Sequence, residues 1–176
     1  RLVGRLDRLD VHDAPEGRYV RVVDYKSGDR NLSLADIANG LSMQLPAYLA
    51  VALSSMRQET ASVLPAGIFH MRLEPPDIRR QDGGTDGAEA DRRKRMRLTG
   101  YVLDDPQVLG AMDRQLERTG TSEILKASLN RDGTISSRTK TLSAQGFERL
   151  GDMIGGTIGR LGAELMAGSI PVRPVR

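Results

Sequence analysis

The sequence contains no cysteine and no tryptophan, and it has few other aromatic residues. Four tyrosines and two phenylalanines bring the aromatic content of its 176 residues to 3%. Without cysteine, the chain forms no disulfide and offers no thiolate ligand to a metal. With so few aromatic rings, it has little surface on which nucleic-acid bases can stack. Contact with a nucleic acid would therefore depend mainly on charge.

Long apolar runs are also missing. No stretch approaches the roughly 18 apolar residues of a membrane-spanning helix, and no signal peptide opens the chain. We therefore expect no membrane partner and a cytoplasmic location. The net charge of +3 permits an anionic partner but does not prove one.

The length and composition fit one domain. A chain of 176 residues with 39% hydrophobic and 28% charged residues can bury a proper core. It begins inside a strand-like pattern at residues 1–4 and stops without a clear ending at residues 170–176. We therefore expect residues 1–176 to form a single domain that lacks flanking segments of a larger protein.

Hydrophobic periodicity predicts alternating strands and helices. Strand patterns cover residues 2–11, 18–26, 62–73 and 93–103, and helical spacing covers residues 33–56, 104–120 and 143–169. Residues 12–17 and 130–133 carry hairpin-turn residues, and residues 75–91 are expected to form an irregular excursion. This order predicts an α/β fold with a mixed, largely antiparallel sheet flanked by helices.

Two signals refine the first predicted helix. Pro46 lies inside its pattern and predicts a break near residues 42–45. Ser33 and Asn31 are alternative caps for its start.

An acid and a lysine stand two residues apart in VVDYKSG, residues 22–28. Side chains alternate along a strand, so Asp24 and Lys26 point to the same face. Pairing of the first two strands would bring Asp7 close to Asp24. Asp10 belongs to the opposite face unless a bulge intervenes, and we expect it to pair with Arg8 or Arg5.

Two neighbouring carboxylates imply a cation. They repel each other when both are ionised, unless a positive ion lies between them. Oxygen ligands of this kind suit Mg²⁺ or Mn²⁺. A lysine beside them would stabilise negative charge that develops in a transition state. Phosphodiester hydrolysis is chemistry that this set can perform.

The helix that follows adds a second signal. Gln44 and Tyr48 are four residues apart, so they share one helix face. An amide and a phenol in that position can hold a phosphate or orient Lys26.

Three segments in this order, GRLDRLD, VVDYKSG and GLSMQLPAYL, resemble the RecB-type nuclease domains of the PD-(D/E)XK superfamily. Across nearly the whole chain, the likeness is to the AddB-type nuclease domains. The resemblance implies a restriction-endonuclease-like core and a metal-dependent DNA exonuclease. Such domains work in ATP-dependent helicase–nuclease complexes, in double-strand break repair and recombination.

The resemblance also assigns roles to individual residues. It implies that Asp7, Asp24 and the backbone carbonyl of Tyr25 hold Mg²⁺ or Mn²⁺. The positions that it marks as catalytic are Asp7, Asp24, Lys26, Gln44 and Tyr48. Four further residues around them are candidate DNA contacts: Arg5, Arg8, Ser27 and Arg30.

Two other groups of residues receive weaker interpretations. His12 and His70 have no ligand spacing, and we expect neither to be catalytic. The basic run at residues 92–97 is interpreted as the solvated start of a strand, with contact to nucleic acid as the alternative.

The chain departs from the family pattern in two ways. The family has an acidic or histidine residue on a helix before the first strand, and AddB-type proteins carry four cysteines for a 4Fe-4S cluster. Neither is present here, and we attribute both absences to truncation. The full-length protein is therefore expected to hold the cluster and to pair with an AddA-type helicase–nuclease subunit. Residues 1–176 alone are expected to be weakly active or inactive.

A different class of function stays open. The chain could be a catalytically silent nuclease-fold module that binds DNA or holds a partner subunit. The presence of Asp7, Asp24 and Lys26 together favours the active nuclease, because a purely structural module has no need of that set.

Overall fold

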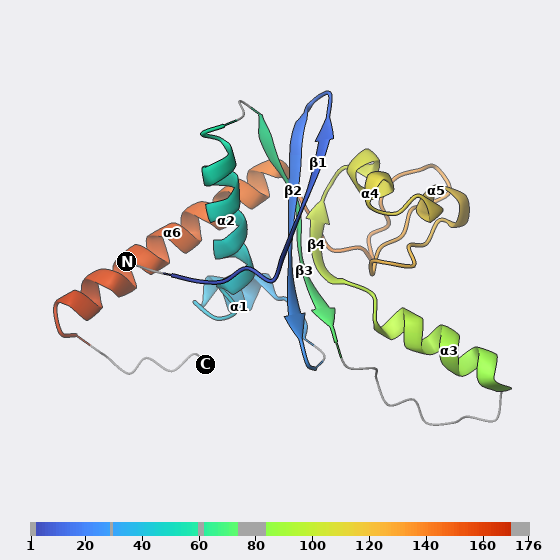
Figure 1. The fold of residues 1–176 in the computed structure, drawn as a ribbon, viewed down its shortest axis with the longest axis horizontal. Helices are drawn as coiled ribbons and strands as arrows, with labels where there is room; N and C mark the ends of the chain where they lie inside the picture. Colours follow the sequence, from blue (N-terminus) through green and yellow to red (C-terminus); the bar gives the residue numbers. More distant parts are fainter. Residues whose placement is uncertain (1–2, 29, 60–61, 74–83, 170–176) are drawn as a thin grey trace.

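The computed structural model of the protein describes residues 3–28, 30–59, 62–73 and 84–169. Within them, one sheet has the strand order β1-β2-β3-β4-β5 (Figure 1). Its strands are β1 (Arg8–Ala14), β2 (Gly17–Lys26), β3 (Val63–Arg72), β4 (Thr99–Leu103) and β5 (Thr141–Leu142). The predicted mixed α/β fold is confirmed. The described pairings divide evenly, since β1–β2 and β3–β4 are antiparallel while β2–β3 and β4–β5 are parallel.

The predicted hairpin of the first two strands is present, but its first strand starts later than expected. β1 begins at Arg8, and residues 3–6 are not part of the sheet. Gly4 lies against the ring of Tyr48, where an added Cβ would come within 2.9 Å of a ring carbon. The chain therefore crosses α2 (Gln44–Met56) before it enters the sheet.

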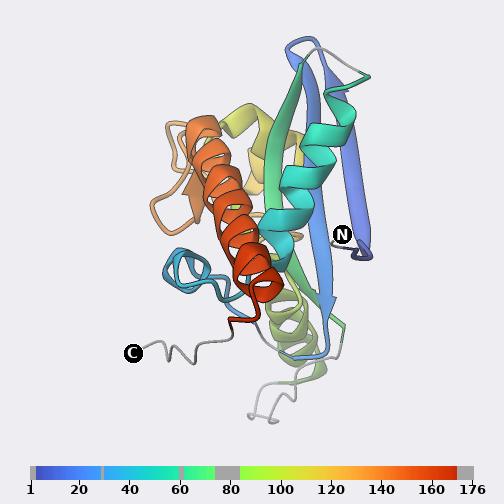
Figure 2. The ribbon, with the colours of Figure 1, turned by 90° about the vertical axis from the view of Figure 1, so that its left-hand side faces the viewer.

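Helices α1 (Leu34–Ala38), α2 and α6 (Ala144–Met166) lie on one side of the sheet. Figure 2 looks onto this side, with α2 and α6 next to each other in front of the strands. Apolar residues from the sheet and from both long helices form a shared core: Val20, Val22, Ile68, Leu45, Leu49, Phe147, Leu150 and Ile154. This core fixes the start of α2 over the end of β2, where the acid and lysine lie.

The break predicted in the first helix is confirmed. Gly40 and Ser42 both have positive φ, at 78° and 52°, which ends α1 and redirects the chain. Pro46 lies in the first turn of α2, where a missing N–H does no harm. The side chain of Ser33 accepts from the backbone N–H of Asp36, so Ser33 caps α1.

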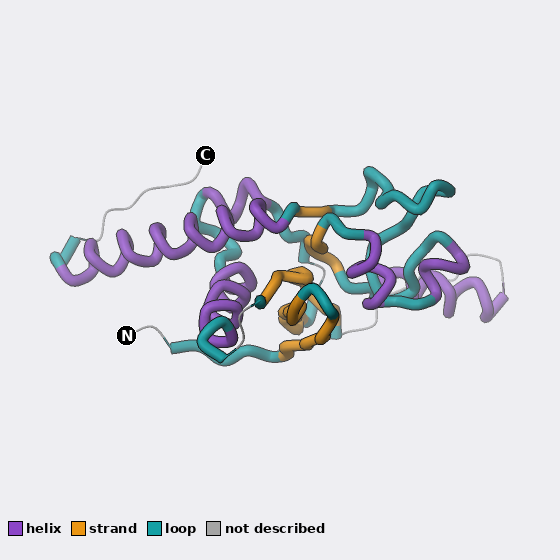
Figure 3. Tube along the Cα trace, turned by 90° about the horizontal axis from the view of Figure 1, so that it is seen from above, coloured by secondary structure: helices purple, strands orange, loops and turns teal. Residues whose placement is uncertain are grey.

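The other side of the sheet carries α3 (Gly84–Arg95), α4 (Pro106–Met112) and α5 (Gln115–Thr119). Figure 3 shows the strands between the two groups of helices. A second core fills this side, built from Val23, Phe69, Val102, Leu109, Leu116 and Leu125. The predicted helix 104–120 is divided at Asp113, whose carboxylate accepts from the backbone N–H of Gln115 at 3.0 Å.

The prediction for residues 84–97 was wrong. Residues 84–95 form α3 instead of an irregular excursion, and most of the basic run ends that helix instead of starting a strand. Ion pairs at helical spacing support α3, Glu89 with Arg93 at 3.3 Å and Asp91 with Arg95 at 3.0 Å. The rest of the predicted excursion, residues 75–83, lies outside the described residues.

The hairpin predicted around residues 130–133 is present only as a local turn. The backbone N–H of Asn130 donates to the carbonyl of Thr134 at 2.8 Å, and Gly133 has a φ of 82°. A single bridge joins Leu129 and Ile135, and the segment adds no strand to the described sheet.

The apolar stripe of α6 is buried only near the helix start. Phe147, Leu150 and Ile154 belong to the core, whereas Leu165 is 65% exposed, because the helix runs past the sheet. Over the described part of the chain, no helix combines the length and the hydropathy that a bilayer crossing requires.

Candidate active site

Asp24 and Lys26 lie at the C-terminal end of β2, on the side covered by α2. Asp24 is only 2% exposed. The Nζ atom of Lys26 is 2.5 Å from Oδ2 of Asp24, and it donates to Oε1 of Gln44 at 3.2 Å. The ammonium is therefore held between a buried carboxylate and a side-chain amide.

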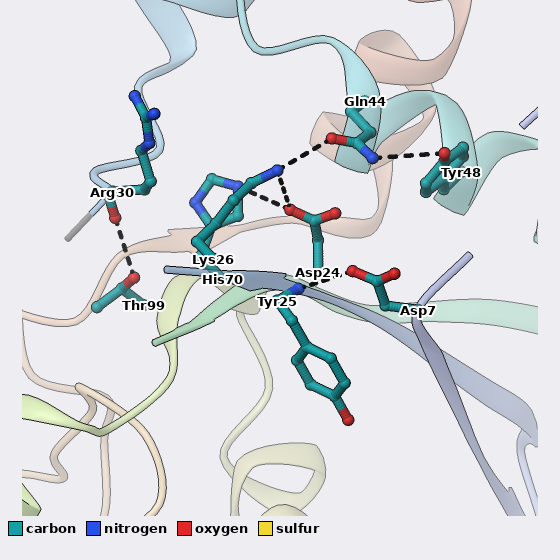
Figure 4. A network of polar contacts seen from close by, with 9 residues as sticks. All are labelled: Asp7, Asp24, Tyr25, Lys26, Arg30, Gln44, Tyr48, His70 and Thr99. Atoms are coloured by element: carbon teal, nitrogen blue, oxygen red, sulfur yellow. Dashed lines mark hydrogen bonds and ion pairs between the residues drawn. The ribbon is translucent and has the colours of Figure 1, made fainter. Parts of the chain in front are cut away.

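Gln44 and Tyr48 continue this network along α2. Gln44 is the first residue of the helix and Tyr48 lies one turn later, as the spacing predicts. Nε2 of Gln44 donates to the phenolic oxygen of Tyr48 at 3.4 Å. A continuous chain of contacts thus links Asp24, Lys26, Gln44 and Tyr48 (Figure 4).

Asp7 reaches the same place from the opposite strand. Arg8 pairs with Val23, so Asp7, one residue earlier, falls opposite Asp24. Its Oδ2 accepts from the backbone N–H of Tyr25 at 2.9 Å. Figure 4 shows both carboxylates on one side of β2 and the ring of Tyr25 on the other. The sheet therefore brings the two acids to one face, where the alternation of side chains placed them.

The free oxygens of the two acids fit a divalent cation. Oδ2 of Asp24 faces Lys26, while its second oxygen is directed toward Asp7. Oδ1 of Asp7 takes part in no hydrogen bond among the described residues. Across those residues, no group of three His, Cys, Asp or Glu side chains gathers at one point. Two carboxylates with the remaining positions left to water or backbone is a ligand set typical of Mg²⁺. The role of the Tyr25 carbonyl stays a prediction.

His70 is a neighbour that the sequence did not reveal. It pairs with Asp24 across the parallel β2–β3 ladder, and its Nε2 is 3.8 Å from Oδ2 of Asp24. Burial lowers the pKa of His70, Asp24 raises it and Lys26 lowers it, with a net decrease. The imidazole is therefore uncharged at neutral pH, and Lys26 is the cation that neutralises Asp24. Only the register of β3 against β2 shows this proximity, and spacing along the chain does not.

The candidate DNA contacts are more scattered. Arg5 and Ser27 are exposed near the two acids. The guanidinium of Arg30 points away from the carboxylates in Figure 4, while its carbonyl accepts from Oγ1 of Thr99 at 3.2 Å. Arg8 lies on the other face of the sheet, in an ion pair with Asp10 at 2.9 Å.

Asp10 is a structural residue, as expected. It pairs with Arg8, and also with Arg21 at 2.7 Å. Burial acts to raise the pKa of its carboxyl, but hydrogen bonds from the two arginines outweigh burial and lower it.

The segment after Lys26 is anchored from the far end of the chain. Nζ of Lys140 donates to Oδ1 of Asn31 at 2.7 Å and to the carbonyl of Leu32 at 2.8 Å. Leu32 is itself buried in the core that contains α2. These contacts support the end of β2 that carries Asp24 and Lys26.

Comparison with known proteins gives concordant matches. The profile of the PD-(D/E)XK nuclease superfamily matches residues 1–175. The AddB-type subunit of the ATP-dependent helicase/deoxyribonuclease of Thermoanaerobacter sp. (strain X514) is 38% identical over 99% of this chain and 15% of its own length. The protein of the same name from Caldanaerobacter subterraneus subsp. tengcongensis is 38% identical over 100% of this chain and 15% of its own. The one from Alkaliphilus oremlandii is 34% identical over 99% and 15%. The chain thus spans about 15% of the length of these relatives.

Proposed function

Because this chain belongs to the PD-(D/E)XK nuclease superfamily, we propose that it hydrolyses DNA phosphodiester bonds with the help of a divalent cation. One observation carries the proposal. A buried carboxylate, a lysine and a second carboxylate converge at the end of β2, and a glutamine–tyrosine pair on α2 holds the lysine. This is the set that the motifs predicted.

Each residue has a role that follows from its contacts. Asp7 and Asp24 would hold Mg²⁺ or Mn²⁺, which acts as a Lewis acid toward the phosphoryl oxygens. Lys26, oriented by Asp24 and by Oε1 of Gln44, stabilises the negative charge that develops on the phosphate. Gln44 donates to Tyr48 through Nε2, and this contact keeps its amide oxygen directed at Lys26.

The setting of this activity is part of the proposal. The relatives, named as AddB-type subunits of an ATP-dependent helicase/deoxyribonuclease, support an exonuclease domain that works with an AddA-type helicase–nuclease subunit in the cytoplasm. Processing of double-strand breaks would be its task. In the full-length protein, cysteines outside these 176 residues would hold a 4Fe-4S cluster.

One observation favours the alternative of a catalytically silent module. Lys26 already neutralises Asp24 at 2.5 Å, as in a structural ion pair. Asp7 does not fit that interpretation, because it is exposed and has no cationic partner among the described residues.

Metal binding and cleavage together test the proposal in the full-length protein. We expect Asp7→Asn to weaken Mn²⁺ binding, measured calorimetrically, and to reduce cleavage of labelled single-stranded DNA by at least about 10²-fold. Asp13→Asn is the matched control, because Asp13 lies on β1 but pairs with Arg18 at 2.7 Å, away from the site. Unchanged Mn²⁺ affinity and unchanged cleavage in Asp7→Asn would contradict the proposal.

A further inference from the structure

Two adjoining cavities lie on the side of the sheet opposite the candidate active site. The first, of about 930 Å³, is bounded by β1, β2, α3 and residues 119–124. The second, of about 720 Å³, is bounded by residues 117–121 and 126–139. Arg97, Thr119 and Thr121 line both, so the cavities form one continuous depression. We call this depression the cationic groove.

Basic side chains dominate the walls of the cationic groove. The first cavity is lined by five arginines and lysines and the second by four, and Arg97 is common to both. Against these eight cations stand three acids, Glu89, Glu117 and Glu123. Four of the cations form no ion pair within the described part of the chain: Lys94, Lys126, Arg131 and Arg138. The groove therefore offers positive charge that the fold itself does not neutralise.

A buried donor inside the groove also lacks a partner. Nε of Arg21 donates to Asp10, but its Nη1 is buried and has no hydrogen-bond acceptor in the described structure. A buried donor without an acceptor is costly, so such a group indicates a ligand that supplies one. Arg21 lines the first cavity, and a phosphate oxygen there would satisfy it.

The rest of the lining indicates what kind of anion fits. Aliphatic side chains such as Val23, Met71 and Leu98 line the first cavity, and hydroxyls such as Thr121, Ser128 and Thr139 line the second. No aromatic ring lines either cavity, so binding by stacking is excluded and binding by charge is favoured. Cavities of this size admit small ligands or single nucleotides, but not a duplex.

The groove lies next to the candidate active site across the thickness of the sheet. Arg21 on β2 faces the groove, while Asp24, three residues later, faces the metal site. Arg8 lines the groove, and the preceding residue, Asp7, is one of the two metal-site acids. A strand that occupies the groove thus passes the edge at β1 within one residue of the site.

We propose that the cationic groove binds the sugar–phosphate backbone of single-stranded DNA, as a second, sequence-independent contact beyond the metal site. The proposal rests on the proposed nuclease function, because the same strand is taken to occupy both faces. Charge complementarity favours DNA, since the unpaired cations extend along two successive cavities, as the charges of a polyanion do. An acidic segment of a partner protein is the competing occupant.

The test measures binding of a fluorescein-labelled oligo-dT to the full-length protein by anisotropy, with EDTA present so that no strand is cut. The groove variant neutralises three exposed groove cations without ion pairs: Lys94→Gln, Lys126→Gln and Arg138→Gln. We expect roughly 10- to 100-fold weaker binding at about 0.1 M salt, and the slope of log affinity against log salt should fall by about 2, since each lost phosphate contact on a single strand contributes about 0.7.

The control variant removes the same charge elsewhere. It neutralises three exposed arginines that do not line the groove: Arg114→Gln, Arg118→Gln and Arg149→Gln. Its affinity and salt slope should stay near those of the unmodified protein.

Three outcomes would be informative. Loss of affinity and slope in the groove variant alone supports the proposal. Equal binding by the two variants overturns it, and loss of partner-subunit association with DNA binding intact overturns it in favour of a protein interface. Failure of the nuclease function is distinguishable, because it would appear as unaltered cleavage in Asp7→Asn, whereas groove binding is measured without cleavage.

Discussion

Lys26→Met separates a catalytic lysine from a structural one. Methionine keeps most of the apolar stem of Lys26 but removes the ammonium that lies 2.5 Å from Asp24 and 3.2 Å from Gln44. Asp24 is then left as a buried carboxylate with His70, an uncharged imidazole 3.8 Å away, beside it. The variant therefore disturbs both the stability and the chemistry of the site, and the two effects can be measured separately.

The expected loss of stability follows from the burial of the pair. Removing one partner of a buried ion pair typically costs about 3 to 5 kcal/mol. The Lys26 side chain is 30% exposed whereas that of Asp24 is 3% exposed, so water reaches the cationic side. We therefore expect the lower end of the range, about 3 kcal/mol. The double variant Asp24→Asn/Lys26→Met should recover much of this loss, because it leaves no buried charge.

Urea unfolding and cleavage of a labelled DNA strand measure the two effects in the full-length protein. If Asp24 binds Mg²⁺, a concentration of about 100 times the dissociation constant should restore about 2.7 kcal/mol to Lys26→Met and nothing to the double variant. Cleavage should fall by about 10² to 10³ in both, since one electrostatic contact to the transition state is missing. Lys26→Arg should not restore activity, because a planar guanidinium does not replace a compact ammonium.

One result would refute this reasoning. If Lys26→Met unfolds at lower urea but cuts DNA at the original rate, Lys26 is a structural partner of Asp24 and has no part in catalysis. The assignment of the site from its motifs would then be wrong for this residue.

Two further predictions concern the fold. Asp113→Asn should destabilise the protein at pH 7, because Asp113 accepts from the hydroxyl of Ser122 at 2.6 Å and from two backbone N–H groups. Burial acts to raise its pKa, but these hydrogen bonds lower it below the ordinary value. The stabilisation is therefore present above about pH 4 and is lost as the pH falls through the lowered pKa, so urea midpoints of the two proteins should converge near about pH 3. Gly100→Ala should cost at least about 1 to 3 kcal/mol by the same assay, since an added Cβ would lie 1.9 Å from the carbonyl oxygen of Ile68. Gly155→Ala, on an open face of α6, should instead stabilise by up to about 1 kcal/mol, and destabilisation there would contradict the packing described.

Local rules predicted much of the fold correctly. The position of Pro46 gave the break before α2, and the alternation along residues 22–26 gave a common face for Asp24 and Lys26. The same rules failed at residues 84–95, where glycine and aspartate suggested a loop but ion pairs at helical spacing accompany a helix. They also placed the start of β1 too early, because the apolar pattern of residues 2–6 does not show that Gly4 packs on Tyr48.

The sequence by itself determined the chemistry available to this protein: two acids, a lysine, and a glutamine–tyrosine pair at fixed spacing, with no thiol and few aromatic rings. These features depend on residue identity and on neighbours a few positions apart, which the chain specifies directly. Only the tertiary structure decided that His70 lies beside Asp24, that Lys140 anchors the segment after Lys26, and that two cavities join into a cationic groove. Each of these is a contact between distant parts of the chain. Such contacts depend on strand register and on packing across the sheet, which local patterns do not specify.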